Sequence, residues 1–282
     1  MFARFAQSWS LVKASASVLR SDKELLLFPL LSALASLVVA ASFFVPAALG
    51  GLFASMRADG RPDAAFYALL FAFYVVQYFV IIFFNSALVG AALIRLRGGD
   101  PTVADGFRIA MSKLPAILGY AIISATVGVV LRALQERAGF IGRFVVGLIG
   151  LAWTVASFLV VPVLVNNDVG PIDAVKRSAE LLKKTWGQNL IGNVGIGLVF
   201  GLLLFALVFV GGGLIVLAAT TKTTALIVLT AVVVGIAILA LVLVQAALQG
   251  IYSAALYRYA AEGEAGGAFA HDMVADAFRV KA

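Results

Sequence analysis

The stretch GLLLFALVFVGGGLIVLAATTKTTALIVLTAVVVGIAILA, from Gly201 to Ala240, carries a single charged side chain, Lys222. A helix that crosses a bilayer needs about 20 apolar residues, so this stretch is too long for one span. The apolar run extends outward on both sides, from Leu190 to Tyr257, and the polar segment Thr220–Thr224 interrupts it near its middle. We therefore predict two transmembrane helices that fold back on each other at Thr220–Thr224.

The composition of the whole chain agrees with a membrane protein. Hydrophobic residues make up 63% of the 282 residues and charged residues only 12%, which is outside the range of soluble globular domains. The net charge of +7 is better explained by membrane topology and anionic lipid than by nucleic acid, which we do not expect as a partner. The chain has no cysteine, so disulfides and thiolate chemistry are excluded.

Four further apolar runs bring the number of predicted spans to six. They cover Leu25–Phe53, Ala64–Leu93, Leu114–Leu131 and Phe144–Val165. The fold class is therefore all-α, a polytopic transmembrane helical bundle, with one membrane domain over residues 1–260 and a polar cytoplasmic tail over 261–282. Pro46 and Pro162 should kink their helices, because proline removes a helical hydrogen bond.

The distribution of lysine and arginine predicts the orientation. Of the 21 basic residues, 15 lie in the terminal segments and in the second and fourth connections, and 6 lie in the other three connections. Basic residues are enriched on the cytoplasmic side of membrane proteins. Both termini should therefore be cytoplasmic.

The segment GPIDAVKRSAELLKKTWGQN, Gly170–Asn189, has the pattern of an amphipathic helix. One face holds apolar residues at spacings of three and four: Ile172, Val175, Ala179, Leu182 and Trp186. The other face is charged, and we expect its basic residues to contact anionic lipid headgroups: Lys176, Arg177, Lys183 and Lys184. The alternative is that the apolar face packs on the transmembrane bundle, and the two interpretations can hold together.

Similar segments begin at Phe2 and before Leu114, so the chain contains a weak repeat. Each of the three units is predicted to consist of a cytoplasmic interfacial amphipathic helix followed by a transmembrane hairpin. The units cover residues 1–93, 94–166 and 167–260.

The segment GPIDAVKRSAELLKKTWGQNLIG resembles the Gly-Pro-x-x-Ala-x-x-Arg-Ser motif that recurs before a hairpin in bacterial six-span membrane proteins. One such protein is the membrane domain attached to some glycerophosphodiester phosphodiesterases. The whole chain, which opens with FARFAQSWSLVKASASVLRSDKELLLFPLLS, is more similar to an uncharacterised family of bacterial integral membrane proteins of unknown function. The resemblance implies a six-span fold in the bacterial inner membrane, and it implies no activity.

The chain offers little for catalysis. Its single histidine, His271, lies in the polar tail, and its 14 acidic residues lie at span ends, in connections or in the tail. A histidine triad, a two-histidine metal site and a membrane-embedded carboxylate for proton coupling are therefore not expected. We predict no catalytic residue, no metal ligand and no cofactor.

Two intramembrane features remain. Neutral polar residues form a stripe on the second span, Gln77 and Asn85, and another on the sixth, Gln245 and Gln249. The stripes could line a cavity for a headgroup or small solute, but interhelical hydrogen bonding is the favoured interpretation. Gly197 and Gly201, four apart on the fifth span, provide a flat strip for helix packing within the chain or, as the alternative, between two copies.

These observations favour a non-enzymatic integral membrane protein that organises lipid or a membrane-protein partner through its basic amphipathic helices. A facilitative transporter or channel for a small solute or lipid is the alternative. It would use the Gln77, Asn85, Gln245 and Gln249 stripes as its path.

Overall fold

The computed structural model describes residues 2–50, 64–184 and 186–264, and the regular structure in these ranges is helical. In chain order the helices are α1 (Phe2–Ser21), η1 (Lys23–Leu26), α2 (Leu27–Leu49), α4 (Ala64–Leu96), α5 (Val103–Ser112), α6 (Leu114–Arg137), α7 (Phe140–Ala156), α8 (Val160–Asn166), α9 (Pro171–Lys184), α10 (Trp186–Thr220) and α11 (Thr224–Glu262). Most of the predicted tail, including His271, lies outside the described residues.

Six segments are long and apolar enough to cross a membrane, so the prediction of a six-span all-α membrane protein is confirmed at this level. Helices α2, α4 and α6 supply the first three of these segments, and α7 together with α8 supplies the fourth. Helices α10 and α11 form the predicted hairpin, and α10 ends and α11 begins on either side of a turn at residues 221–223. Lys222 in this turn has a positive φ of 56°, which reverses the chain direction tightly.

The fourth span is broken into two helices. Helix α7 ends at Ala156 and α8 begins at Val160, so the break lies at residues 157–159. Pro162 is the third residue of α8. The first N–H groups of a helix have no acceptor within the helix, so the N–H that proline lacks costs no helical hydrogen bond here. The predicted kink is therefore a break upstream of the proline, as expected from the clash of a proline ring with the carbonyl four residues earlier.

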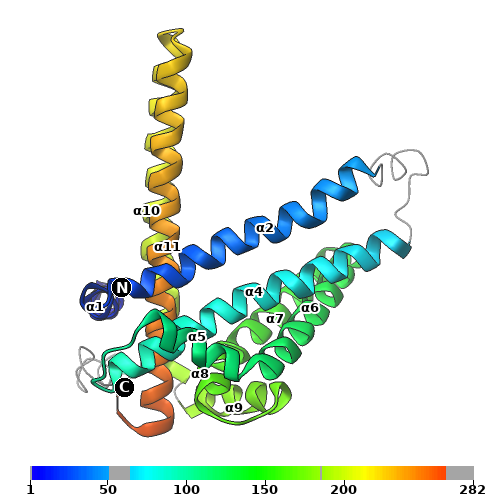
Figure 1. Cartoon of the computed structure of the whole chain (residues 1–282), viewed down its shortest axis with the longest axis vertical. Helices are drawn as coiled ribbons and strands as arrows, with labels where there is room; N and C mark the ends of the chain where they lie inside the picture. The colour runs from blue at the N-terminus through cyan, green and yellow to red at the C-terminus, as the bar shows by residue number, and fades with distance from the viewer. Residues whose placement is uncertain (1, 51–63, 185, 265–282) are drawn as a thin grey trace.

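The helices diverge from a common base (Figure 1). Helices α10 and α11 run side by side as one long hairpin, whereas α2, α4, α6 and α7 lean away from it together. Helix α11 has 39 residues and is therefore about 58 Å long, close to twice the roughly 30 Å hydrocarbon layer. The outer half of this hairpin is covered by apolar side chains that the rest of the chain leaves exposed, such as Phe205, Phe209 and Ile236.

The packed core lies at the base, where α4, α8, α9 and the end of α11 meet. Small residues of α4, Ala87, Gly90, Ala91 and Ala92, let the neighbouring helices approach its backbone closely. Large side chains from other helices fill the space around them, among them Phe28, Leu164 and Ile251. We refer to this side of the molecule, where α4, α8 and α11 end, as the charged end.

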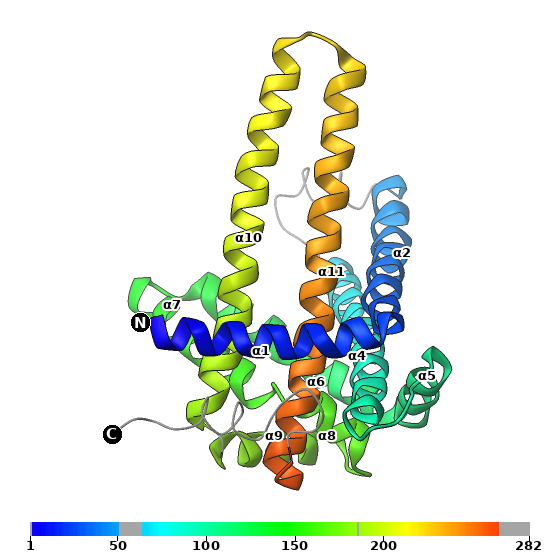
Figure 2. The same cartoon turned by 90° about the vertical axis from the view of Figure 1, so that its left-hand side faces the viewer.

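Three shorter or less apolar helices surround the base. Helix α1 runs across α10 and α11 (Figure 2), α5 packs on α4, and α9 packs on α7 and α8. In chain order, α1, α5 and α9 correspond to the three segments that were predicted to be amphipathic. Whether the chain consists of three related units stays a prediction.

The buried face of α9 differs from the predicted one. The residues that α9 buries fully are Ala174, Ser178, Leu181 and Leu182, whereas Ile172 is 61% exposed and Ala179 is also exposed. The packing of the predicted apolar face on the bundle therefore holds for Leu182 and not for Ile172 or Ala179, and its placement at the membrane interface stays a prediction. Close packing against α7 and α8 requires small side chains, and Ala174 and Ser178 meet that requirement.

Candidate functional site

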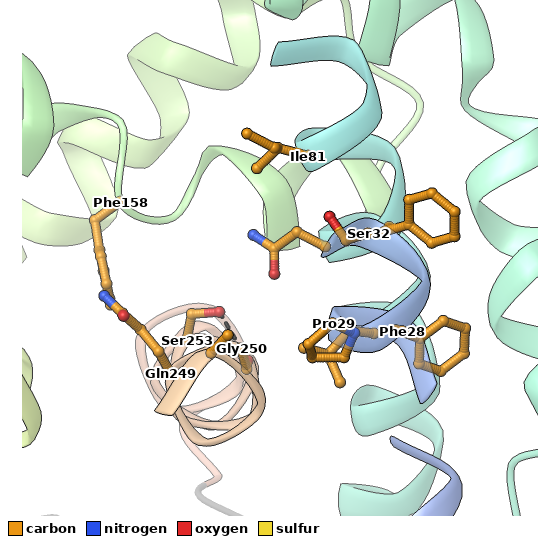
Figure 3. Close-up of a pocket in the computed structure, with 12 residues that line it drawn as sticks. Phe28, Pro29, Ser32, Ile81, Phe158, Gln249, Gly250 and Ser253 are labelled. Carbon is orange, nitrogen blue, oxygen red and sulfur yellow. Dashed lines mark hydrogen bonds between the residues drawn. The ribbon is translucent and has the colours of Figure 1, made fainter. Parts of the chain in front are cut away.

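A cavity of about 290 Å³ lies between α2, α4 and α11, on the membrane side of the charged end. Pro29 and Ser32 from α2, Ile81 from α4 and Gln249 and Ser253 from α11 surround it, and Phe158 from the break in the fourth span covers one side (Figure 3). Phe28, Phe84, Asn85, Leu88, Ala246 and Gly250 complete the lining. The cavity is therefore walled by segments that lie far apart in the sequence.

The polar groups of the cavity are two amides and two hydroxyls. Asn85 on α4 and Gln249 on α11 are the amides, and Ser32 and Ser253 are the hydroxyls. The Ser253 hydroxyl donates a hydrogen bond of 2.8 Å to the carbonyl of Gly250. Within the part of the chain that the structure describes, the Asn85 amide makes no hydrogen bond and is available to a ligand.

Gly250 brings the two amides together. A Cβ atom at this position would collide with the Leu88 side chain and would lie 3.4 Å from the Asn85 Oδ1 atom. Only a residue without a side chain allows α11 to approach α4 this closely. Gly250 thus sets the distance between the Asn85 and Gln249 sides of the cavity.

The aromatic wall of the cavity is supported from outside by α5. Phe107 of α5 packs against the cavity residues Phe28 and Phe84, with ring centroids 5.7 and 5.8 Å apart. Gly106 lies against the same ring of Phe28, and a Cβ atom there would be 2.5 Å from it. Thr102 caps the helix through a reciprocal capping box with Asp105, and these hydrogen bonds from Thr102 hold the pKa of Asp105 below its usual range.

The predicted polar stripes are only partly brought together. Asn85 and Gln249 line the same cavity, but Gln77 and Gln245 are not part of its lining. The Gln77 Oε1 atom is buried and has no hydrogen-bond partner among the described residues. The stripes separate because α10 and α11 diverge from α4 with distance from the charged end (Figures 1 and 2).

The predicted headgroup-binding residues lie on the outer face of α9. Lys176 and Arg177 are 70% and 57% exposed, and Lys183 is also exposed, whereas the side chain of Lys184 lies outside the described structure. Lys176 pairs with Asp173 at 3.3 Å and Arg177 with Glu180 at 3.8 Å. Such exposed pairs are weak, so an anionic headgroup could replace the carboxylates.

Sequence reasoning missed the role of Ser178, which is fully buried between α9 and the broken fourth span. Its hydroxyl donates to the carbonyl of Ala156 at 2.6 Å and accepts from the N–H of Leu159 at 3.0 Å. The break leaves these two backbone groups without helical partners, and Ser178 satisfies both. The serine of the Gly-Pro-x-x-Ala-x-x-Arg-Ser motif therefore has a structural task, and Pro171 of the same motif packs against Gly119 of α6.

A network of ionic and polar side chains closes the charged end. Arg258, which is only 5% exposed, donates to the carbonyl of Leu96 and pairs with Glu262 and Glu264, both at 3.1 Å. Arg97 joins Glu262 to Asn166, and Arg95 pairs with Asp22 and Asp100. The sequence marked these arginines only as topology signals, although Glu262 lies four residues after Arg258.

A further ion pair links the start of α6 to the connection before α9. Lys113 donates to the carboxylate of Asp168 and, at 3.1 Å, to the carbonyl of Asn167. The hydrogen bond from the ammonium group holds the pKa of Asp168 below its usual range. Among the described residues, no three His, Asp or Glu side chains are grouped so that they could hold a metal ion.

The glycine strip of the fifth span faces outward. A Cβ atom at Gly197 or Gly201 would meet no described atom within 4 Å. The close contacts of this hairpin lie elsewhere, for example at Gly211, where a Cβ atom would be 2.6 Å from the Val234 side chain of α11.

No curated protein and no solved structure matches the chain. A family model described as a family of unknown function, DUF6159, matches residues 64–267, which is well over half of the chain and includes α4 and all later helices. The chain therefore belongs to the family of unknown function DUF6159.

Proposed function

We propose that this protein is a non-enzymatic membrane protein that organises lipid, in the bacterial inner membrane, with both termini in the cytoplasm. The lipid would be held in two places, the cavity between α2, α4 and α11 and the basic outer face of α9. The resemblance of the Gly170–Ser178 segment to the membrane domain of some phosphodiesterases adds a fold and no reaction to this proposal.

The cavity is the observation that carries the proposal. It lies where the α10–α11 hairpin diverges from α2 and α4, and its lining combines aromatic and aliphatic side chains with a few neutral polar groups. This combination is typical of sites for amphiphilic small molecules. Beyond the cavity, α2 exposes Leu34, Leu37 and Val38, and α11 exposes Leu239 and Val242, which are suited to contact acyl chains.

Native mass spectrometry of the full chain released from nanodiscs tests the proposal. Wild type should retain lipid, and replacing Lys176, Arg177, Lys183 and Lys184 by Gln should lower the retention of anionic lipid relative to zwitterionic lipid. A matched control replaces Arg132 and Arg137, which lie on α6, by Gln. Wild type that retains no lipid, or an α9 variant that retains anionic lipid as well as the control does, would contradict the proposal.

The second candidate is a facilitative path for a small solute, and the buried unpaired Oε1 atom of Gln77 favours it. A buried polar atom without a partner is costly in a membrane, and a passing solute or water could satisfy it. The cavity lining ends at Ile81 on α4 and Ala246 on α11, so such a path would require further opening towards Gln77.

The absence of cysteine makes the two candidates and the orientation easy to distinguish. Single substitutions of Gln77 and Gln245 by Cys should react with a small membrane-impermeant thiol reagent if the path is wet. They should stay unreactive if the protein only organises lipid. Lys222→Cys should react from outside intact cells and Lys183→Cys only after lysis, and the reverse pattern would contradict the proposed orientation.

A further inference from the structure

We propose that the cavity selects the uncharged glycerol-ester part of a lipid and discriminates against anionic headgroups. This inference rests on the proposed lipid-organising function and names the class of ligand at one of its two sites. The shared chemistry is a small core with ester carbonyls and a hydroxyl. It can come from a diacylglycerol or from the neck of a phospholipid whose headgroup stays outside.

The first argument is the charge of the lining. None of the twelve described lining residues is ionisable, and the polar ones are amides and hydroxyls. An anion that entered the cavity would lose its hydration without gaining an opposite charge, which is strongly unfavourable. Uncharged ester and hydroxyl groups do not incur this cost.

The arginines that follow the cavity on α11 and α4 are already paired with acidic side chains. Arg258 follows the lining residue Ser253 by five positions of α11, which is about 7.5 Å along the helix. Arg258 is bound to the Leu96 carbonyl and to Glu262 and Glu264, and Arg95 is bound to Asp22 and Asp100. An anionic group is therefore better placed on the outer face of α9, where the basic residues are exposed.

The second argument is the arrangement of hydrogen-bonding groups. Each carboxamide provides both a donor and an acceptor, so Asn85 and Gln249 can serve an ester carbonyl and a hydroxyl alike. Ser32 adds a hydroxyl from the third helix, α2, so the polar residues of the lining come from three helices. A compact ligand core with several polar atoms can contact all three helices at once.

The third argument is size. The cavity of about 290 Å³ is just below the 300–1,000 Å³ that is typical of sites for drug-sized ligands. That space holds a glycerol core with the first carbons of its chains and cannot hold a whole lipid. The chains must leave along α2 and α11, which diverge from each other beyond the cavity (Figure 1).

Photo-crosslinking of the full chain in nanodiscs tests the inference. The probe is a diacylglycerol with a diazirine near its ester groups, and the competitors are unlabelled diacylglycerol, phosphatidylcholine and phosphatidylglycerol. We expect adducts on residues 81–88 and 246–253, with competition by diacylglycerol and little by phosphatidylglycerol. Competition by phosphatidylcholine as strong as that by diacylglycerol would identify a phospholipid neck as the source and would support the inference.

Two variants separate the cavity from the surface. Asn85→Leu with Gln249→Leu should lower crosslinking about tenfold, the loss of one to two hydrogen bonds, whereas Gln245→Leu, outside the lining, should retain it. The α9 variant with four Gln substitutions should also retain it.

The outcomes distinguish the inference from the proposed function. Stronger competition by phosphatidylglycerol than by diacylglycerol, or adducts only outside the cavity, would overturn the inference and leave lipid binding intact. Wild type that neither crosslinks the probe nor retains any lipid would overturn both. The wild-type competition series needs no variant, so the test holds even if the double variant fails to fold.

Discussion

Replacing Ser178 by Ala should destabilise the broken fourth span, and by far more than the removal of one hydroxyl from a helix surface destabilises a helix. The Ser178 hydroxyl is fully buried and serves two backbone groups of the break, the Ala156 carbonyl and the Leu159 N–H. Alanine would leave the N–H of the fully buried Leu159 without a partner, and the part-buried Ala156 carbonyl would lose its donor. A buried group left unsatisfied costs about 1–3 kcal/mol, so we expect a loss of about 2–3 kcal/mol for the pair.

Hydrogen exchange measured on the full chain in nanodiscs is the sharpest assay. A loss of about 2 kcal/mol raises the open population roughly thirtyfold, and the Leu159 amide should exchange faster by that factor. The α9 helix should loosen with it, since α9 packs on α7 and α8. The matched control is Ser42→Ala, which removes an exposed hydroxyl that donates only to the Val39 carbonyl in its own helix.

The control should change stability by no more than about 0.5 kcal/mol. If Leu159 in Ser178→Ala exchanged at the wild-type rate, the bridging hydroxyl would have no energetic importance. The structural explanation of the Gly-Pro-x-x-Ala-x-x-Arg-Ser motif would then be wrong. Faster exchange spread evenly over all helices would also refute it, because the argument requires a local effect.

Three further perturbations test other parts of the structure. Gly106→Ala places a Cβ atom 2.5 Å from an aromatic carbon and 2.7 Å from a backbone oxygen, so it should lower the unfolding free energy by about 2 kcal/mol, whereas Gly147→Ala, in open space, should not. Arg258→Met should cost about 1–3 kcal/mol in steric-trapping measurements, because it leaves the buried Leu96 carbonyl without its donor, and wild-type stability would show that the network is dispensable. The lowered pKa of Asp168 means that its link to Lys113 stabilises the fold above the ordinary carboxyl pKa of about 3.9 and is lost as the pH falls through the lowered value. The melting gap between wild type and Lys113→Met should therefore be larger at neutral pH than in strong acid, where only the hydrogen bond to the Asn167 carbonyl remains, and an equal gap at both pH values would contradict the assignment.

The spans could be predicted from the sequence because crossing a bilayer requires a property that is local in the chain. About 20 apolar residues in a row are needed, and each of the six segments has them. The turn between α10 and α11 could be predicted for the same reason, because its signal is also local: the polar residues Thr220–Thr224 interrupt the longest apolar run. These features depend on composition and not on which helices meet.

The contacts between helices could not be predicted, because they depend on the rotation and tilt of each helix. The buried face of α9 includes Ala174 and Ser178, whose small size suits close packing and whose hydrophobicity is low. Asn85 and Gln249 share a cavity while Gln77 and Gln245 do not, since the hairpin diverges between these levels. Glu262 follows Arg258 by four residues, so this ion pair can be predicted from the sequence. The hydrogen bond from Arg258 to the Leu96 carbonyl joins residues 162 positions apart and cannot be predicted in this way.

The way the three surrounding helices pack explains why the cavity is a stronger candidate site than any one of them. Helix α5 packs back on α4, which precedes it, and α9 packs back on α7 and α8, which precede it. Helix α1 packs on α10 and α11, so the first helix of the chain holds the last hairpin and the contacts close into a ring. The cavity lies inside this ring and takes its walls from α2 and α4, from Phe158 at the break and from α11. Each of the three surrounding helices packs mainly on one or two neighbouring helices, whereas this cavity takes residues from all three hairpins, and a ligand bound there would stabilise them together.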